Sequence, residues 1–246
     1  NNQYNLNCLD YNDYPNIKID ESKTPITLNA KELKSIINET SFAISTQELR
    51  PILTGINIRI NGDLLECVAT DSYRLAKKNV KLSTVTNNQI DIVIPGRNIN
   101  ELEKILTDDD DVIVHVFNNK VLFMYKNIMF QSNLLNGNYP NTSNLIPTDF
   151  SYIIKVGLNE FNAAIDRAAL LTQGKDKNII KMNLDGDKMV ISSSSSELGR
   201  VEEKLNIETT NKEKLEISFS SKYMLEALKT MKDDEILVLL NSDNKE

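Results

Sequence analysis

The stretch CVATDSYRLAKK, residues 67–78, places side chains that are able to do chemistry in a row behind a strand-like run. Thr70, Ser72 and Tyr73 offer hydroxyl groups, Asp71 offers a carboxylate, and Arg74 offers a guanidinium group with five donors. This set fits three interpretations: an ordinary strand end, a catalytic cluster, or a docking site for another molecule.

Other residues of catalytic or metal-binding type lack the partners that such chemistry needs. His115 lies inside the strand-like run VIVHV without ligand spacing, and Cys67 lies in an apolar alternation typical of a small core residue. The run Asp108–Asp111 lacks the spaced acidic residues and closing glutamate of a calcium loop, so a solvated turn is the simpler interpretation. The sequence has no phosphate-binding glycine loop. It therefore predicts a non-catalytic protein without metal or cofactor.

Composition narrows the class of protein. The chain has 246 residues, of which 40% are hydrophobic and 26% charged, as expected for a globular protein with one large domain or two ordinary ones. A formal net charge of −7 excludes a uniformly basic nucleic-acid binder, but not a protein with one basic face. Two cysteines outside any metal-ligand spacing, and no apolar run of roughly 20 residues, predict a cytoplasmic protein that does not cross a membrane.

The chain contains an internal repeat. The segments INIRINGDLLECV (56–68) and IKMNLDGDKMVIS (180–192) align without gaps, and each predicts a β-hairpin that turns at Asn-Gly-Asp or Asp-Gly-Asp. The segments IDIVIPGRNINELEKIL (90–106) and LEISFSSKYMLEALKTM (215–231) each predict a strand, a break and an amphipathic helix, with Pro95 near the first helix start and Ser220 or Ser221 as cap of the second. Each unit also opens with a helix, at 29–40 and 158–171.

The repeat predicts the domain organisation. Residues 1–20 are expected to be the tail of a preceding unit, 21–147 a middle unit, and 148–246 a third unit that lacks its C-terminal end. Each unit combines two helices with about eight strands, which predicts an α+β fold with antiparallel sheet. A repeat of roughly 125 residues is an array of domains rather than a short-period solenoid.

Several motifs resemble the DNA polymerase III beta subunit, the bacterial sliding clamp family. They cover nearly the whole chain in order: SFAISTQELRPILTGINIRI (41–60), VATDSYRLA (68–76), VIPGRNINELEKIL (93–106), LLNGNYPNTSNLIP (134–147), LNEFNAAIDRAALLT (158–172) and FSSKYMLEALKTM (219–231). The resemblance implies three similar domains per subunit in a head-to-tail homodimeric ring around double-stranded DNA, with helices lining the hole and sheets outside. It also implies a processivity factor that tethers the polymerase alpha subunit, the clamp loader and other proteins with a clamp-binding motif.

The resemblance implies a pocket for partner peptides between the middle and third domains. Carried over by motif, it uses Leu53, Thr70, Ser72, Tyr73, Arg74, Leu75, Pro140, Leu145 and Ile146. In the third unit the counterpart of the opening stretch is ISSSSSELGRVE (191–202), so the repeat itself does not require Thr-Asp-Ser-Tyr-Arg-Leu there. Two departures from the family pattern are Tyr73, where histidine is frequent, and Asn144, where some relatives carry arginine. The alternative is that the apolar residues of this set only seal the junction between domains.

Basic residues on the predicted helices are the candidates for contact with DNA. Arg97 and Lys104 lie seven residues apart and share a helix face, and Lys222 and Lys229 repeat the spacing. The complete DNA-facing set is Gln47, Lys31, Lys34, Arg97, Lys104, Arg167, Lys222 and Lys229, with Lys175 and Lys177 adding charge after the fourth helix. From the residues alone, a solvated face with ion pairs to Glu101 and Glu226 is favoured, whereas the resemblance favours DNA.

A second hypothesis retains the peptide pocket but assigns the protein no contact with DNA. It describes a repeat-built protein-interaction domain without a DNA role, and the Arg97/Lys104 and Lys222/Lys229 pattern separates the two hypotheses. The loop that holds Gln47 has Pro51 and Ile52 in place of the family's usual aromatic residues.

Overall fold

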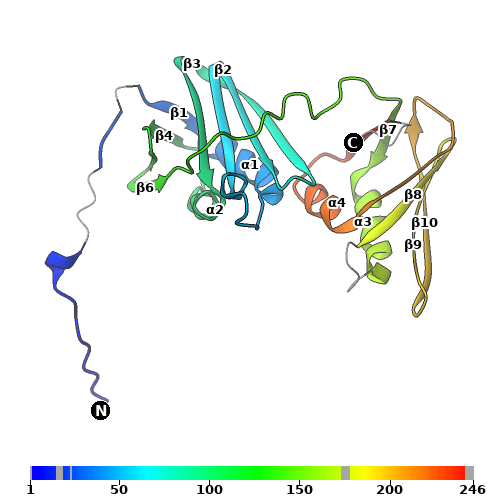
Figure 1. Ribbon diagram of the computed structural model, residues 1–246, viewed down its shortest axis with the longest axis horizontal. Helices are drawn as coiled ribbons and strands as arrows, with labels where there is room; N and C mark the ends of the chain where they lie inside the picture. The colour runs from blue at the N-terminus through cyan, green and yellow to red at the C-terminus, as the bar shows by residue number, and fades with distance from the viewer. Residues whose placement is uncertain (1, 15–18, 23, 173–177, 242–246) are drawn as a thin grey trace.

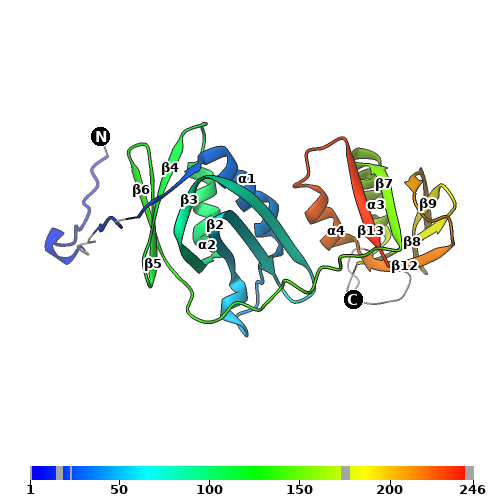
Figure 2. The ribbon, with the colours of Figure 1, turned by 90° about the horizontal axis from the view of Figure 1, so that it is seen from above.

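The computed structural model describes residues 2–14, 19–22, 24–172 and 178–241. Two bodies of packed helices and strands follow one another along the chain, and an extended segment after β6 joins them (Figures 1 and 2). Residues 2–14 are exposed, lie away from both bodies and contain one short 3₁₀ helix. The α+β class with antiparallel sheets, predicted from the repeat, is confirmed.

The regular elements follow the order that the repeat predicts. The α-helices are α1 (Ala30–Thr40), α2 (Gly96–Ile105), α3 (Leu158–Ala169) and α4 (Ser221–Leu228), and the 3₁₀ helices are η1 (Tyr11–Asp13), η2 (Ser41–Ala43), η3 (Pro51–Thr54) and η4 (Leu170–Thr172). The strands are β1 (Ile26–Asn29), β2 (Gly55–Thr70), β3 (Leu75–Pro95), β4 (Asp111–Val116), β5 (Lys120–Tyr125), β6 (Ile128–Asn133), β7 (Tyr152–Gly157), β8 (Ile179–Asp185), β9 (Lys188–Ser195), β10 (Gly199–Asn206), β11 (Glu208–Thr209), β12 (Leu215–Ser220) and β13 (Glu235–Leu240).

The predicted hairpin at residues 56–68 lies inside the single element β2. The side chains of Arg59 and Glu66 approach to 3.4 Å, whereas seven residues of extended strand would span roughly 23 Å, so β2 doubles back between them. The reversal occurs at Gly62, whose φ of +64° suits a residue without Cβ. Residues 55–60 then pair with 90–95, and 64–70 pair with 75–81.

The third unit repeats this arrangement with separate strands. β8 and β9 form the predicted hairpin, with Asp185 opposite Lys188 and Gly186 at a φ of +60°. The sheet order is β10-β9-β8-β12, which corresponds to segments 75–81, 64–70, 55–60 and 90–95 of the middle unit. Of the two serines that the sequence offered as a cap for α4, Ser220 takes the role: its hydroxyl accepts a hydrogen bond from the backbone of Tyr223 at 3.5 Å.

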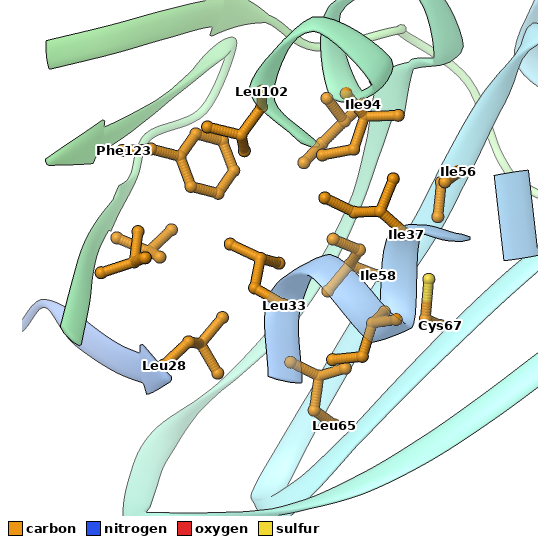
Figure 3. Close-up of a cluster of buried hydrophobic side chains, with 14 of the residues drawn as sticks. Leu28, Leu33, Ile37, Ile56, Ile58, Leu65, Cys67, Ile94, Leu102 and Phe123 are labelled. Carbon is orange, nitrogen blue, oxygen red and sulfur yellow. The ribbon is translucent and has the colours of Figure 1, made fainter. Parts of the chain in front are cut away.

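The core of the middle unit lies between its helices and its sheets. Leu33 and Ile37 of α1 point toward Ile58 of β2, and Leu102 of α2 points toward Phe123 of β5 (Figure 3). Asn29 caps α1 by accepting from the backbone of Lys31 and Glu32, so the helix begins where the sequence predicted. A separate cluster fills the third unit around Phe161 and Ile165 of α3. Each hydrophobic cluster belongs to one unit, while the limits 1–20, 21–147 and 148–246 stay a prediction.

The residues that the sequence singled out as possible catalytic or metal-binding groups are buried in the fold or paired with neighbouring side chains. The Nδ1 atom of His115, a buried residue of β4, accepts a hydrogen bond from the backbone N–H of Ser22 at 2.9 Å. Burial raises the pKa of the Cys67 thiol to about 12. Asp109 forms an ion pair with Lys31, and Asp108 forms one with Lys126.

Within the described residues, no group of three or more histidine, cysteine or acidic side chains is arranged to hold a metal ion, and no helix could span a membrane.

Candidate functional site: a groove between the two units

The turn from β2 to β3 is fixed by hydrogen bonds of its own side chains. One carboxylate oxygen of Asp71 accepts from the backbone N–H groups of Tyr73 and Arg74 at 2.9 and 3.0 Å. The Thr70 hydroxyl donates to the carbonyl of Arg74 at 2.6 Å and accepts from the N–H of Ser72 at 3.1 Å. Ser72 has a φ of +75°, which a non-glycine residue adopts only when its surroundings hold it there. These hydrogen bonds make the turn a platform that carries Tyr73 and Arg74.

Arg74 reaches from this platform to the third unit. Its Nε atom lies 3.1 Å from Asp71 in the same turn, and its Nη1 atom forms an ion pair with Glu226 of α4. The guanidinium carbon lies 4.4 Å from the ring centre of Tyr223, close enough for a cation–π interaction. The rings of Tyr73 and Tyr223 are 6.5 Å apart. In both overall views α4 is on the side of the third unit that faces the middle unit (Figures 1 and 2).

A cavity of about 800 Å³ lies between the two units beside this contact. The middle unit supplies one wall from η2 and the start of β3, and the third unit supplies the other from the start of β8, the end of β12 and α4. Its lining residues are Phe42, Tyr73, Arg74, Leu75, Asn178, Ile179, Phe219, Ser220, Lys222, Tyr223, Met224 and Ala227. The chemistry of the walls, aromatic and aliphatic with a few polar groups, suits a short peptide with apolar side chains.

A second cavity of about 540 Å³ shares five of these residues and is more polar. Gln47 and Arg97, both predicted to face DNA, line it together with Asp71 and Glu226. The two sites that the sequence treated separately, the peptide pocket and the DNA-facing helices, therefore meet around Arg74 and Tyr223.

Three of the predicted pocket residues line the 800 Å³ cavity, Leu53 and Ser72 line a further cavity of about 230 Å³ together with Tyr73, and the other four line neither. Tyr73, Arg74 and Leu75 line the 800 Å³ cavity. Leu53 is buried in a small cluster with Val68, Val93 and Tyr139. Thr70 is buried and Ser72 exposed in the turn, while Pro140, Leu145 and Ile146 are exposed on the segment that joins the two units.

Tyr139 ties that joining segment to the turn. Its hydroxyl accepts a hydrogen bond from the backbone N–H of Thr70 at 3.0 Å. Burial raises the pKa of Tyr139 to about 12, so the phenol stays protonated at neutral pH. The neighbouring residue, Pro140, is thereby held close to the end of β2.

The seven basic residues of the predicted DNA-facing set fall into two groups. Four are engaged in ion pairs: Lys31 with Asp109, Lys34 with Glu103, Lys104 with Glu101, and Arg167 with Glu203. The bidentate contact of Arg167, at 2.8 and 2.7 Å, lowers the pKa of the Glu203 carboxyl. Arg97, Lys222 and Lys229 are exposed and form no ion pair with any residue that the structure describes. Lys175 and Lys177 lie outside the described residues.

Sequence reasoning missed the third unit's side of the groove. Tyr223, Glu226, Ile179 and Phe219 carried no assigned pocket role, and Glu226 was expected to pair with the lysines of its own helix. One signal was available: Tyr223 is a large aromatic residue next to, and not part of, the apolar stripe Met224, Leu225, Leu228 and Met231. A tyrosine in this position can pack its ring against another domain while its hydroxyl stays in water.

The chain matches family models over most of its length. Residues 27–141 match the model of the DNA polymerase III beta subunit, central domain, and residues 143–246 match the model of its C-terminal domain. The chain belongs to the DNA polymerase III beta subunit family.

Relatives in this family carry the name beta sliding clamp. Those of Bacillus subtilis and Staphylococcus epidermidis are each 42% identical to the chain over 96% of its length. The chain spans 63% of the length of either relative.

Solved structures of sliding clamps have the same fold as this chain. The crystal structure of the Bacillus subtilis DNA polymerase sliding clamp superposes with a TM-score of 0.91 at 40% identity, covering 97% of this chain and 66% of that one. A sliding clamp from Pseudomonas aeruginosa, solved bound to griselimycin, superposes with a TM-score of 0.89 at 25% identity, covering 96% of this chain and 64% of that one.

Proposed function

We propose that the chain acts within a sliding clamp: a non-catalytic processivity factor that encircles double-stranded DNA and tethers the replicative polymerase in the cytoplasm. The observation that carries the proposal is the groove between two units of the beta subunit fold. We propose as its occupants the clamp-binding motifs of the polymerase alpha subunit, the clamp loader and other partners. The full-length protein is proposed to form a head-to-tail homodimer.

The chemistry of the groove supports reversible binding of a short peptide. Leu75, Ile179, Phe219 and Met224 offer apolar surface to leucine and phenylalanine side chains, and Ser220 and Asn178 offer polar groups. A few apolar anchors in a partly open groove give an affinity on the order of micromolar, about −8 kcal/mol. That strength suits partners that exchange on one clamp.

Ile179→Asp tests the proposal. Ile179 is 45% exposed, so the substitution leaves the fold intact while it places a charge in the apolar wall. We expect at least about tenfold weaker binding of a short peptide with adjacent leucine and phenylalanine residues, measured by fluorescence anisotropy. The control is Ile128→Asp on β6, which is 39% exposed and lies outside the groove. Equal affinity of both variants and the wild type would contradict the assigned site.

The second candidate function, a protein-interaction domain without a DNA role, has one observation in its favour. Lys31, Lys34, Lys104 and Arg167 already face carboxylates, which reduces the positive field that the helices offer to phosphates. Arg97, Lys222 and Lys229 remain for DNA, and they decide between the two functions.

A further inference from the structure

The two units of the chain lack a shared hydrophobic core. The large cluster of the middle unit ends with Leu134, the cluster of the third unit begins with Tyr152, and the small cluster around Leu53 belongs to the middle unit. The segment between them has turns but no helix or strand. Interfaces of this kind allow domains to move relative to one another unless specific contacts hold them. The relative position of the groove walls therefore depends on the contacts around Arg74.

The contacts around Arg74 are suited to holding the two units in one relative position. The side chain of Arg74 is only 16% exposed and that of Glu226 is 34% exposed, so the ion pair between them is shielded more than a surface pair. Asp71 holds the guanidinium group from the other side, and Tyr223 and Phe42 lie 4.4 and 5.5 Å from its carbon. Charge and stacking together fix the direction in which Arg74 points.

The groove is already formed while this ion pair is closed. Arg74 and Tyr223 line both the 800 Å³ and the 540 Å³ cavity, so they stand at the boundary between the two. A ligand in the larger cavity can therefore bind without breaking the pair. A preformed groove lowers the conformational entropy that binding would otherwise cost.

We infer that Glu226 is a positioning residue of the partner site: by holding Arg74 of the middle unit against α4, it keeps the two groove walls at the spacing that a partner peptide needs. The inference rests on the proposed function, because it concerns the same groove. It assigns to α4 of the third unit a role in binding that does not require Glu226 to touch the peptide.

Glu226→Gln tests the inference, because it removes the charge and keeps the shape. Nitroxide labels on Asn79→Cys and Lys188→Cys, both exposed, in a Cys8→Ser background report the distance between the units. We expect a broader distance distribution and about three- to tenfold weaker binding of the leucine- and phenylalanine-containing peptide. Glu216→Gln is the matched control, because Glu216 pairs with Lys181 within the third unit. It is expected to change neither measurement.

A charge exchange separates positioning from general destabilisation. In an Asp71→Asn background, which removes the neighbouring negative charge and keeps an oxygen acceptor for the turn, Arg74→Glu alone should broaden the distance distribution, and adding Glu226→Arg should narrow it again. Unchanged or tighter peptide binding by a folded Glu226→Gln variant would overturn the inference, as would an unchanged distance distribution. A wild-type chain that does not bind the peptide would contradict the proposed function instead, and the distances would then decide the inter-unit role alone.

Discussion

At the scale of single residues, the chemistry of the groove depends on charges that already have partners. Arg74 is held by Asp71 and Glu226, so its guanidinium group is oriented before any ligand arrives. The basic residues on the helices divide in the same way: Lys104 faces Glu101, whereas Lys222 and Lys229 are unpaired among the described residues. A lysine with a carboxylate neighbour attracts a phosphate less strongly than one without.

Charge reversal of these lysines in the full-length ring should therefore have unequal effects. Lys222→Glu with Lys229→Glu is expected to reduce the slope of log affinity against log salt for duplex DNA by about 2, because two phosphate contacts are lost. Lys104→Glu should change it less. The measurement is retention on nicked circular DNA over a range of salt concentrations, with Lys181→Glu on β8 as control. Retention that is insensitive to Lys222 and Lys229 would favour the interaction domain without a DNA role.

At the scale of elements, β2 and β3 form the platform on which the site is built. Gly55 lies where β2 begins and β3 ends, and the two strands approach closely there. An added Cβ at Gly55 would lie 2.5 Å from the carbonyl oxygen of Ile94, so this position has no room for a side chain. At Gly62 the surroundings are open, and only the positive φ disfavours other residues. The two glycines are thus required for different physical reasons.

This difference predicts unequal costs for the same substitution. Gly55→Ala should lower the free energy of unfolding by about 2–3 kcal/mol, because the backbone of β3 has to move. Gly62→Ala should cost about 1 kcal/mol for the left-handed conformation alone. Urea denaturation of both variants measures the two values. Equal costs would contradict the packing of Gly55 against β3.

At the scale of the whole molecule, two separately packed units are joined by a segment without regular structure. Their largest clusters share no residue, and the ion pair between Arg74 and Glu226 joins their surfaces. Such an arrangement favours independent unfolding, because a partly exposed ion pair contributes far less than a hydrophobic core.

We therefore expect two transitions in differential scanning calorimetry. Leu33→Ala should remove about 2–5 kcal/mol from the middle unit and shift one transition, and Phe161→Ala should shift the other. Leu33 and Phe161 are each buried in one of the two cores. Leu49→Ala serves as a control, because Leu49 is 90% exposed. A single transition that moves equally with both core variants would show that the units unfold as one.

The sequence by itself determined the elements and their repetition. Alternating and helical periodicities placed α1 to α4 and the hairpins at Gly62 and Gly186, because these features depend on neighbours a few residues away. It also placed Tyr73 and Arg74 beside each other behind a strand-like run. The family resemblance, drawn from short motifs, is confirmed by the family models over residues 27–141 and 143–246.

Only the tertiary structure decided what faces the groove. Arg74 and Glu226 are 152 residues apart in the chain, and no local pattern indicates that they meet. The same folding buried Leu53 in a core and left Leu145 and Ile146 on the joining segment. Periodicity identifies which face of an element is apolar, but the partner of that face depends on how two units pack. For this reason the sequence did not predict that α4 forms part of one groove wall.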